Sequence, residues 1–429
     1  MLTPRSATLI AATLPLVSEH MEQISADFYR RLFSAHPALE SDLFNRGNQA
    51  RGDQQRALAG AVVAFARHLT TPGAPPVAEL MARISNKHAS LGIVEDQYPV
   101  VHEHLFAAIA AVLGDAVTAD VGAAWNEVYW LMADELVAAE SALYRHAHVG
   151  DGEVWGDRLV IDRQQAAEGT VSLVLAAPEG QPPLPSFLPG QFISVQMRLP
   201  DGAEQIRQYS LSSSPGMDGR WRITVRRIEP TRGSHAAYLP GEVSNAIVDT
   251  VHEGDTIRTS LPFGAVGLPD EGVPLVMISA GAGITPFLGI LHYLADTGDA
   301  RTIRVLHSDR TPERLAHRGE LDELLARLPG ADAVLWFTDG RAQEDRHLRV
   351  SATDVPDGAV VVVCGPIPFM TSVRAQLIDA GVDPGLIRTA VFGPEPDPLR
   401  DPTAPGTRRS RSRHGRHAGE ASSTGDGKP

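Results

Sequence analysis

A turn of small residues in the C-terminal third of the chain could hold a phosphate group. Ser279-Ala280-Gly281-Ala282-Gly283-Ile284-Thr285-Pro286 directly follows Leu275-Val276-Met277-Ile278, which has the pattern of a buried strand. Small side chains let the backbone approach a pyrophosphate, and free N–H groups at the start of a helix face its negative charge. We predict that the turn at 281–286 binds a nucleotide, although a tight strand–helix turn without a ligand would show the same glycine spacing.

Two further features support a ligand-binding role for this half of the chain. Val360-Val361-Val362-Val363 runs into Cys364-Gly365-Pro366, and ligands of open parallel sheets bind where strands end in this way. Upstream, a β-rich region carries Pro189-Gly190-Gln191-Phe192 and Arg207-Gln208-Tyr209-Ser210. A guanidinium suits a phosphate and a tyrosine ring suits a flat heterocycle. Taken alone, the second run would equally be a strand-end arginine and a core tyrosine.

Together, these motifs resemble the ferredoxin–NADP reductase family, in which an antiparallel FAD barrel precedes an α/β nucleotide-binding domain. The resemblance implies that Arg207 pairs with the FAD pyrophosphate, Tyr209 stacks on the isoalloxazine and Ser210 bonds to flavin N5. Gln208 and Phe192 belong to the same implied FAD site. NAD(P)H is implied at Gly281, Ala282, Gly283, Ile284, Thr285 and Pro286. Cys364 would lie near the nicotinamide or be an inert buried thiol.

Three polar side chains on predicted helices could supply a metal ligand and its support. His88 ends the run Ile84-Ser85-Asn86-Lys87-His88, Tyr98 lies ten residues on, and Glu140 falls in the helical segment 135–144. Without further context, a helical histidine is more often a surface or core residue. Tyr98 would then be an ordinary packed tyrosine and Glu140 an exposed carboxylate.

The segment around His88 resembles the proximal haem helix of flavohaemoglobins. The resemblance implies that His88 is the axial iron ligand of haem b. It also implies that Tyr98 and Glu140 hydrogen-bond to each other and that the carboxylate bonds to the imidazole. A carboxylate on the non-ligating nitrogen increases electron donation to the iron, which favours activating O2 over storing it.

The resemblance also covers the other side of the haem. It implies that Tyr29 hydrogen-bonds to the bound gas and that Gln54 is a second polar contact. Leu58, one turn later, would wall the pocket, and Phe44 would be wedged against the porphyrin. A phenol and an amide are the donors that a dioxygen gaining negative charge requires. For each residue alone, core packing is the simpler interpretation.

The resemblance to flavohaemoglobins extends over residues 1–395. It includes Lys87, which in the family influences the haem–flavin contact, and the closing run Val391-Phe392-Gly393-Pro394, whose phenylalanine lies over the flavin. The sequence departs from the family at three places: Ala390 replaces an acidic residue, Phe192 lacks the hydroxyl of a tyrosine, and residues 230–240 look like an insertion. These departures bear on how efficiently the flavin is used.

The activity that the resemblance implies is nitric oxide dioxygenase. NAD(P)H electrons would pass through FAD to the haem, and O2 would oxidise nitric oxide to nitrate. Two alternatives stay open: a haem-based oxygen or redox binding module with a weak reductase, and a flavin reductase acting on external acceptors. The choice between NADH and NADPH is open too, because Arg310 suits a 2′-phosphate and the preceding Asp309 opposes one.

The hydrophobic periodicity changes along the chain and predicts a multidomain protein. Residues 1–148 have the three- and four-residue apolar spacing of an all-α domain, the implied globin. Short strands separated by Pro and Gly predict an antiparallel β-barrel FAD domain at 151–265. Alternating strands and helices predict a parallel α/β nucleotide-binding domain at 266–395. The Pro-, Ser-, Gly- and Arg-rich residues 396–429 have the composition of a disordered tail.

The overall composition excludes several functional classes. The net charge of the 429 residues is −14, which argues against nucleic acid as the main partner. No apolar run reaches the roughly 18 residues of a membrane helix, so we expect no stable membrane insertion. The single cysteine excludes an internal disulfide and suits the cytoplasm. Residues 7–17 could be a weak signal peptide, but their apolar spacing continues to Leu32, as in an amphipathic helix.

Overall fold

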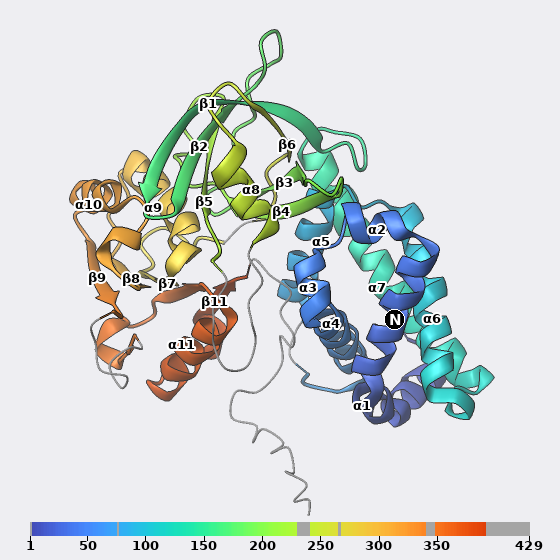
Figure 1. The fold of residues 1–429 in the computed structure, drawn as a ribbon. Helices are drawn as coiled ribbons and strands as arrows, with labels where there is room; N and C mark the ends of the chain where they lie inside the picture. Colours follow the sequence, from blue (N-terminus) through green and yellow to red (C-terminus); the bar gives the residue numbers. More distant parts are fainter. Residues whose placement is uncertain (1, 75–76, 230–240, 265–266, 340–347, 392–429) are drawn as a thin grey trace, which may run out of the picture. The chain divides into compact units, whose positions relative to one another are not determined.

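The computed structural model describes residues 2–74, 77–229, 241–264, 267–339 and 348–391 (Figure 1). The described residues fall within one compact unit. The segment 230–240, the run Phe392-Gly393-Pro394 and the tail from 396 lie outside the described residues. Across the described ranges, no helix combines the length and apolar character needed to cross a membrane.

The first part of the chain is helical, as the periodicity predicts. Seven α-helices follow one another: α1 (Pro4–Ala35), α2 (Pro37–Asp42), α3 (Arg46–Arg51), α4 (Asp53–Thr70), α5 (Ala78–Leu91), α6 (Tyr98–Leu113) and α7 (Ala119–His146). The long α1 buries Ile10, Leu14 and Val17 at helical spacing, so the N-terminal segment is part of an amphipathic helix. It packs against α4, α6 and α7, and the core of the helical domain lies between these helices.

The second part is an antiparallel sheet of six strands in the order β4-β3-β6-β1-β2-β5. Its strands are β1 (Trp155–Ala167), β2 (Thr170–Ala176), β3 (Phe192–Arg198), β4 (Glu204–Ser210), β5 (Arg220–Arg226) and β6 (Thr256–Ser260). Leu211, just past β4, forms a bridge with Ile223 of β5. The two edge strands therefore meet, and the sheet curls into the predicted barrel. Helix α8 (Glu242–Thr250) packs on it.

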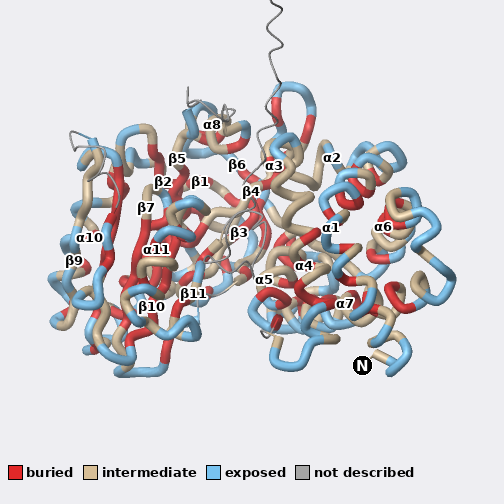
Figure 2. Tube along the Cα trace, turned by 90° about the horizontal axis from the view of Figure 1, so that it is seen from below, coloured by how far each residue is buried: buried red, intermediate tan, exposed pale blue. Residues whose placement is uncertain are grey.

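The third part is a parallel sheet in the order β11-β10-β7-β8-β9. It comprises β7 (Leu275–Ala280), β8 (Ile303–Asp309), β9 (Ala331–Phe337), β10 (Val360–Cys364) and β11 (Ile387–Ala390), with helices α9 (Thr285–Thr297), α10 (Arg318–Arg327) and α11 (Ile367–Asp379). Separate apolar clusters cover its two faces, and Figure 2 shows β7 and β10 as buried. The strand order reverses between β7 and β10, and nucleotides bind at such a switch point.

Candidate functional site

The side chains of His88, Tyr98 and Glu140 meet in one hydrogen-bonded group. They come from three helices, α5, α6 and α7. Nδ1 of His88 lies 2.8 Å from Oε1 of Glu140 and 3.3 Å from the Tyr98 hydroxyl. The Tyr98 hydroxyl donates to the same Glu140 oxygen at 2.7 Å. Glu140 is only 2% exposed, so the group is shielded from bulk water.

The Glu140 carboxylate determines which nitrogen of His88 carries the proton. A carboxylate oxygen only accepts hydrogen bonds, so Nδ1 of His88 donates to it. The other ring nitrogen, Nε2, keeps a free lone pair, which is the form that binds iron. Burial, together with the neighbouring carboxylate, raises the pKa of Tyr98 and keeps its hydroxyl protonated. The geometry therefore fits an axial haem ligand made electron-rich by a buried carboxylate.

The end of α5 is fixed by contacts with the following segment. Gly92 caps the helix with a φ of +78°, and a Cβ at this position would come within 2.9 Å of the Gly152 carbonyl oxygen. The indole N–H of Trp155 donates to the Leu91 carbonyl at 3.2 Å. Only glycine suits both the left-handed backbone and the close approach. These contacts limit rotation of α5 and so help to orient His88.

The residues predicted for the distal side also lie together. Tyr29 is 5% exposed, Gln54 hydrogen-bonds to it, and the Phe44 ring meets it edge-on with 5.6 Å between centroids. Burial raises the pKa of Tyr29 and the Gln54 hydrogen bond only partly opposes this, so the phenol keeps its proton. Leu58 follows Gln54 by one turn of α4 and packs against the same core.

A cavity of about 480 Å³ adjoins Tyr29. It is lined by Ala26, Tyr29, Arg30, Phe33, Glu40, Arg46, Gln49, Ala50 and Gln55. Three buried polar atoms of its lining residues lack a hydrogen-bond partner within the described ranges: Nε of Arg46, Nε2 of Gln49 and Oε1 of Gln55. Such atoms are costly unless water or a ligand reaches them. Of the residues predicted for the haem site, Tyr29 is the one that lines this cavity, so the cavity leads to the Tyr29 side of that predicted site.

The run Arg207-Gln208-Tyr209-Ser210 forms the end of β4, beside β3. Phe192 lies directly opposite Ser210 in this register, and Ser210 is buried. Burial lowers the pKa of Arg207 and raises that of Tyr209. A guanidinium held out of water without a full complement of anions is poised to bind one. This observation fits the pyrophosphate of FAD.

Further cations surround Arg207. Lys87, next to His88 on α5, is desolvated, and Arg207 and Arg83 lie near it, so that its pKa falls to about 8. Arg46 and Arg51 add to the positive potential at Arg207. A cluster of like charges is unfavourable by itself and is stabilised by a bound anion. The structure thus brings the helix that carries His88 up to the predicted flavin strand.

The predicted nucleotide turn lies at the switch point of the parallel sheet. It runs from Gly281, whose φ is +56°, through Gly283 into the start of α9. A Cβ on Gly283 would lie 2.4 Å from the carbonyl oxygen of Cys364, so this turn touches the turn after β10. Ile284, Thr285 and Pro286 are buried at the helix start, whereas Ala282 is exposed. The exposed backbone at Ala282 is accessible to a pyrophosphate.

The structure also places the two residues that bear on NADH against NADPH. Asp309 is 7% exposed and ion-pairs with Arg226 at 2.8 Å. Burial raises the pKa of Asp309, but the neighbouring His307 ring and the hydrogen bond from Arg226 outweigh it, so the net pKa is lowered. Arg310 is exposed. The ion pair with Arg226 neutralises the charge of Asp309, and the choice between NADH and NADPH stays open.

Comparisons with known proteins agree with this three-part organisation. The globin family model matches residues 26–136, the oxidoreductase FAD-binding domain 159–267 and the oxidoreductase NAD-binding domain 277–375. The chain is 36% identical over 408 residues to a flavohemoprotein of Bordetella pertussis, a match that covers 92% of this chain and 99% of that protein. A flavohemoprotein of Rhizobium meliloti is 36% identical over 411 residues, with the same coverage.

The chain belongs to the flavohemoprotein family. It is an oxidoreductase with globin, FAD-binding and NAD-binding domains. A solved flavohemoglobin from Malassezia yamatoensis, with bound FAD and heme, has a similar fold with a TM-score of 0.79. It is 33% identical, and the match covers 91% of this chain and all of that one. The predicted fold class is confirmed.

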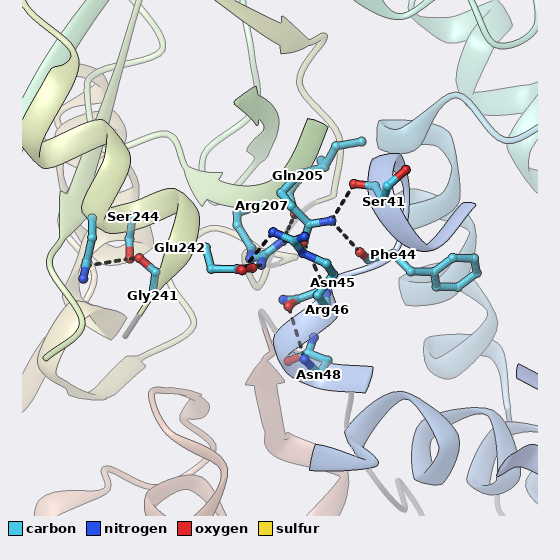
Figure 3. Close-up of polar contacts among 12 residues, drawn as sticks. Ser41, Phe44, Asn45, Arg46, Asn48, Gln205, Arg207, Gly241, Glu242 and Ser244 are labelled. Carbon is cyan, nitrogen blue, oxygen red and sulfur yellow. Dashed lines mark hydrogen bonds and ion pairs between the residues drawn. The ribbon is translucent and has the colours of Figure 1, made fainter. Parts of the chain in front are cut away.

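Sequence reasoning missed a residue that joins the predicted flavin strand, β4, to the globin domain of this flavohemoprotein. Gln205, in β4, is fully buried. Its amide donates to the carbonyls of Ser41 at 2.8 Å and Phe44 at 3.1 Å, and its oxygen accepts from Arg207 at 3.1 Å (Figure 3). A polar residue inside a strand would have been the only signal. Gln205 fixes the segment carrying Phe44 against the strand carrying Arg207.

A second connection between the domains of this flavohemoprotein lies on the proximal side. The hydroxyl of Ser194 in β3 donates at 2.9 Å to the hydroxyl of Ser90, two residues after His88, and both residues are fully buried. The amide of Gln208 donates to the same Ser194 hydroxyl at 3.0 Å. Residues of the proximal helix and of the flavin strand are thus separated by a single serine.

The departures from the family pattern fall in three places: Phe192 lies in β3 opposite Ser210, Ala390 lies in β11, and residues 230–240 are outside the described residues. Ala390 ends β11 and pairs in register with Cys364, where it is buried. Cys364 is 1% exposed and burial raises its pKa, so the thiol is inert at neutral pH. Val391 is partly buried. The predicted roles of Phe392, Gly393 and Pro394 concern residues that are not described.

Glu140→Gln tests the proximal hydrogen bond in this flavohemoprotein. The amide keeps the shape but removes the charge, so His88 becomes a weaker electron donor. We expect the reduction potential of the haem to rise by tens of millivolts. Potentiometric titration of the haem band measures the shift, with Glu135→Gln on the same helix as the matched control. An unchanged potential would contradict the electronic role assigned to Glu140.

Proposed function

We propose that this flavohemoprotein is a nitric oxide dioxygenase that converts nitric oxide and O2 to nitrate with electrons from NAD(P)H. The hydrogen-bonded group of His88, Tyr98 and Glu140 is the observation that carries the proposal. A buried carboxylate on the proximal imidazole favours O2 activation. The FAD- and NAD-binding domains supply the electrons. We place the activity in the cytoplasm, where NAD(P)H is available.

In this proposal, separate groups of residues would bind the haem, the FAD and the nucleotide. Haem b, when bound, supplies O2 activation, and FAD converts a hydride into single electrons. His88 would hold the iron through Nε2, while Glu140 keeps Nδ1 protonated and Tyr98 donates to the same carboxylate oxygen. The nucleotide would lie against the turn at 281–286. The FAD site would comprise Arg207 to Ser210 with Phe192 and Lys87.

On the distal side, Tyr29 and Gln54 would act as hydrogen-bond donors. Both are neutral, so they can stabilise negative charge that develops on the reacting oxygen atoms without a change of protonation. Leu58 and Phe44 would exclude bulk water from the same space. The cavity beside Tyr29 would be the route by which nitric oxide enters and nitrate leaves.

The direct test is nitric oxide consumption by the full chain reconstituted with haem and FAD. We expect rapid loss of nitric oxide that needs both NADH and O2, with nitrate formed in equal amount. Loss of nitric oxide that does not depend on O2 would contradict the proposal. Flavin that fails to reduce the haem would instead favour an oxygen-binding module.

Tyr29→Phe tests the distal donor. Because the change removes one hydroxyl from a buried site, the fold should persist while the developing charge loses a donor. We expect turnover of nitric oxide to fall by about 10- to 100-fold. A nitric oxide electrode measures the rate, and Tyr144→Phe, whose hydroxyl donates to a backbone carbonyl, is the matched control. Equal rates in the two variants would show that the Tyr29 hydroxyl has no catalytic role.

A further inference from the structure

An acidic side chain lies inside the proposed FAD site. Glu242 is the first residue of α8, and its Oε2 lies 3.6 Å from Nη2 of Arg207 (Figure 3). Arg207 is the residue proposed to bind the FAD pyrophosphate. An anion held by Arg207 therefore comes within range of the Glu242 carboxylate, and like charges at such distances repel. By itself, Glu242 opposes the binding of FAD.

Arg46 of the globin domain contacts the other oxygen of that carboxylate. Its Nη2 lies 2.9 Å from Oε1 of Glu242, and its Nη1 lies 2.6 Å from Asp201. The hydrogen bond to Asp201, followed by the charge of Glu242, raises the pKa of Arg46, so the guanidinium is always charged. The arginine thus places a positive charge beside the Glu242 oxygen that does not face Nη2 of Arg207 at 3.6 Å.

The position of Arg46 is set by its backbone as well as by its side chain. Its N–H donates to Oε1 of Gln205 at 3.2 Å, and Gln205 is fully buried. The Gln205 amide also holds the carbonyl of Phe44, two residues earlier. The side chain of Arg46 is 29% exposed. A partly buried, doubly anchored arginine loses little entropy on pairing, unlike the arginine of a fully exposed ion pair.

We infer that Arg46 is a determinant of FAD affinity, supplied by the globin domain, which neutralises Glu242 so that a pyrophosphate can bind Arg207. The inference rests on the FAD site of the proposed function. It adds a positioning and electrostatic role for a residue about 160 positions before that site. The globin domain then contributes to flavin binding as well as accepting its electrons.

Titration of the FAD-free, haem-loaded full chain with FAD, followed by flavin fluorescence, tests the inference. Arg46→Ala should raise the Kd for FAD about tenfold at low ionic strength. Glu242→Gln should bind FAD at least as tightly as the unaltered chain. In the double variant the loss should disappear, giving a Kd within about twofold of that of Glu242→Gln. High salt should shrink the effect of Arg46→Ala.

Arg31→Ala, which loses an ion pair with Asp27 within α1, is the matched control and should leave the Kd unchanged. The haem absorption band shows that each variant keeps its globin fold. If the double variant is as weak as Arg46→Ala, or if Arg46→Ala binds FAD normally, the inference is wrong while the proposed function stands. An unaltered chain that takes up no FAD would overturn both.

Discussion

Replacing His88 by alanine should yield a chain that binds FAD and reduces it with NADH but does not retain haem. The imidazole is the only proximal group oriented by a buried carboxylate within the described residues, so no neighbour can replace it. Nitric oxide turnover should fall more than about a hundredfold. Mutating a residue that only hydrogen-bonds to a metal ligand already lowers metal affinity or activity by about 10- to 100-fold. The absorption spectrum and a nitric oxide electrode measure the two effects.

His20→Ala is the matched control for this variant. His20 lies on α1 and contacts the carbonyl of Leu16 in its own helix, at 3.0 Å, so its loss should not affect the haem. Added imidazole should restore part of the haem band to the His88→Ala chain by filling the space of the lost ring. Full haem content and full nitric oxide turnover without imidazole would contradict the assignment of His88. The rate of flavin reduction by NADH separates this outcome from general unfolding.

Local patterns were sufficient to predict the elements whose periodicity is regular. The run of apolar residues in Val360–Val363 and the small residues after Leu275–Ile278 gave the parallel sheet and its nucleotide turn, because strand burial and turn geometry depend on neighbouring residues. The strand β1 (Trp155–Ala167) was not predicted. Irregular register at Val160/Asp162 and Gln165/Ala167 interrupts its alternation, and polar residues occupy much of its length.

The residues of the candidate site, unlike the regular strands, could not be predicted from local patterns. His88, Tyr98 and Glu140 were assigned through the family resemblance, since a helical histidine and a glutamate 52 residues later carry no local signal of contact. Contacts between domains could not be predicted for the same reason. The pairing of Ser90 with Ser194 spans 104 residues and involves two side chains that are common on any surface. Only the folded chain shows that they meet in a buried interface.

Gly283→Ala should slow the reduction of the flavin by NADH and leave the later electron-transfer steps unchanged. The added Cβ would lie 2.4 Å from the oxygen and 2.7 Å from the carbon of the Cys364 carbonyl, and 3.0 Å from the nitrogen of Gly365. All three atoms belong to the backbone, so no rotamer change can relieve the clash and the turns after β7 and β10 must move apart. Forcing one methyl into such packing costs about 1–3 kcal/mol in the free energy of unfolding.

The same displacement should slow flavin reduction by NADH more than it destabilises the fold. A shift of about 1 Å at a positioning site can cost about a hundredfold in rate, so we expect flavin reduction by NADH to slow by about that factor. Reduction of the flavin by dithionite, which needs no nucleotide site, should be unchanged. Gly319→Ala is the matched control: the new Cβ meets nothing within 4 Å apart from its chain neighbours and the backbone of its own helix, and the residue is near the start of α10. It should leave the rate unchanged and keep or slightly raise stability. If NADH reduces the Gly283→Ala flavin as fast as that of Gly319→Ala, the contact between the two turns does not shape the nucleotide site, and the assignment of residues 281–286 must be revised.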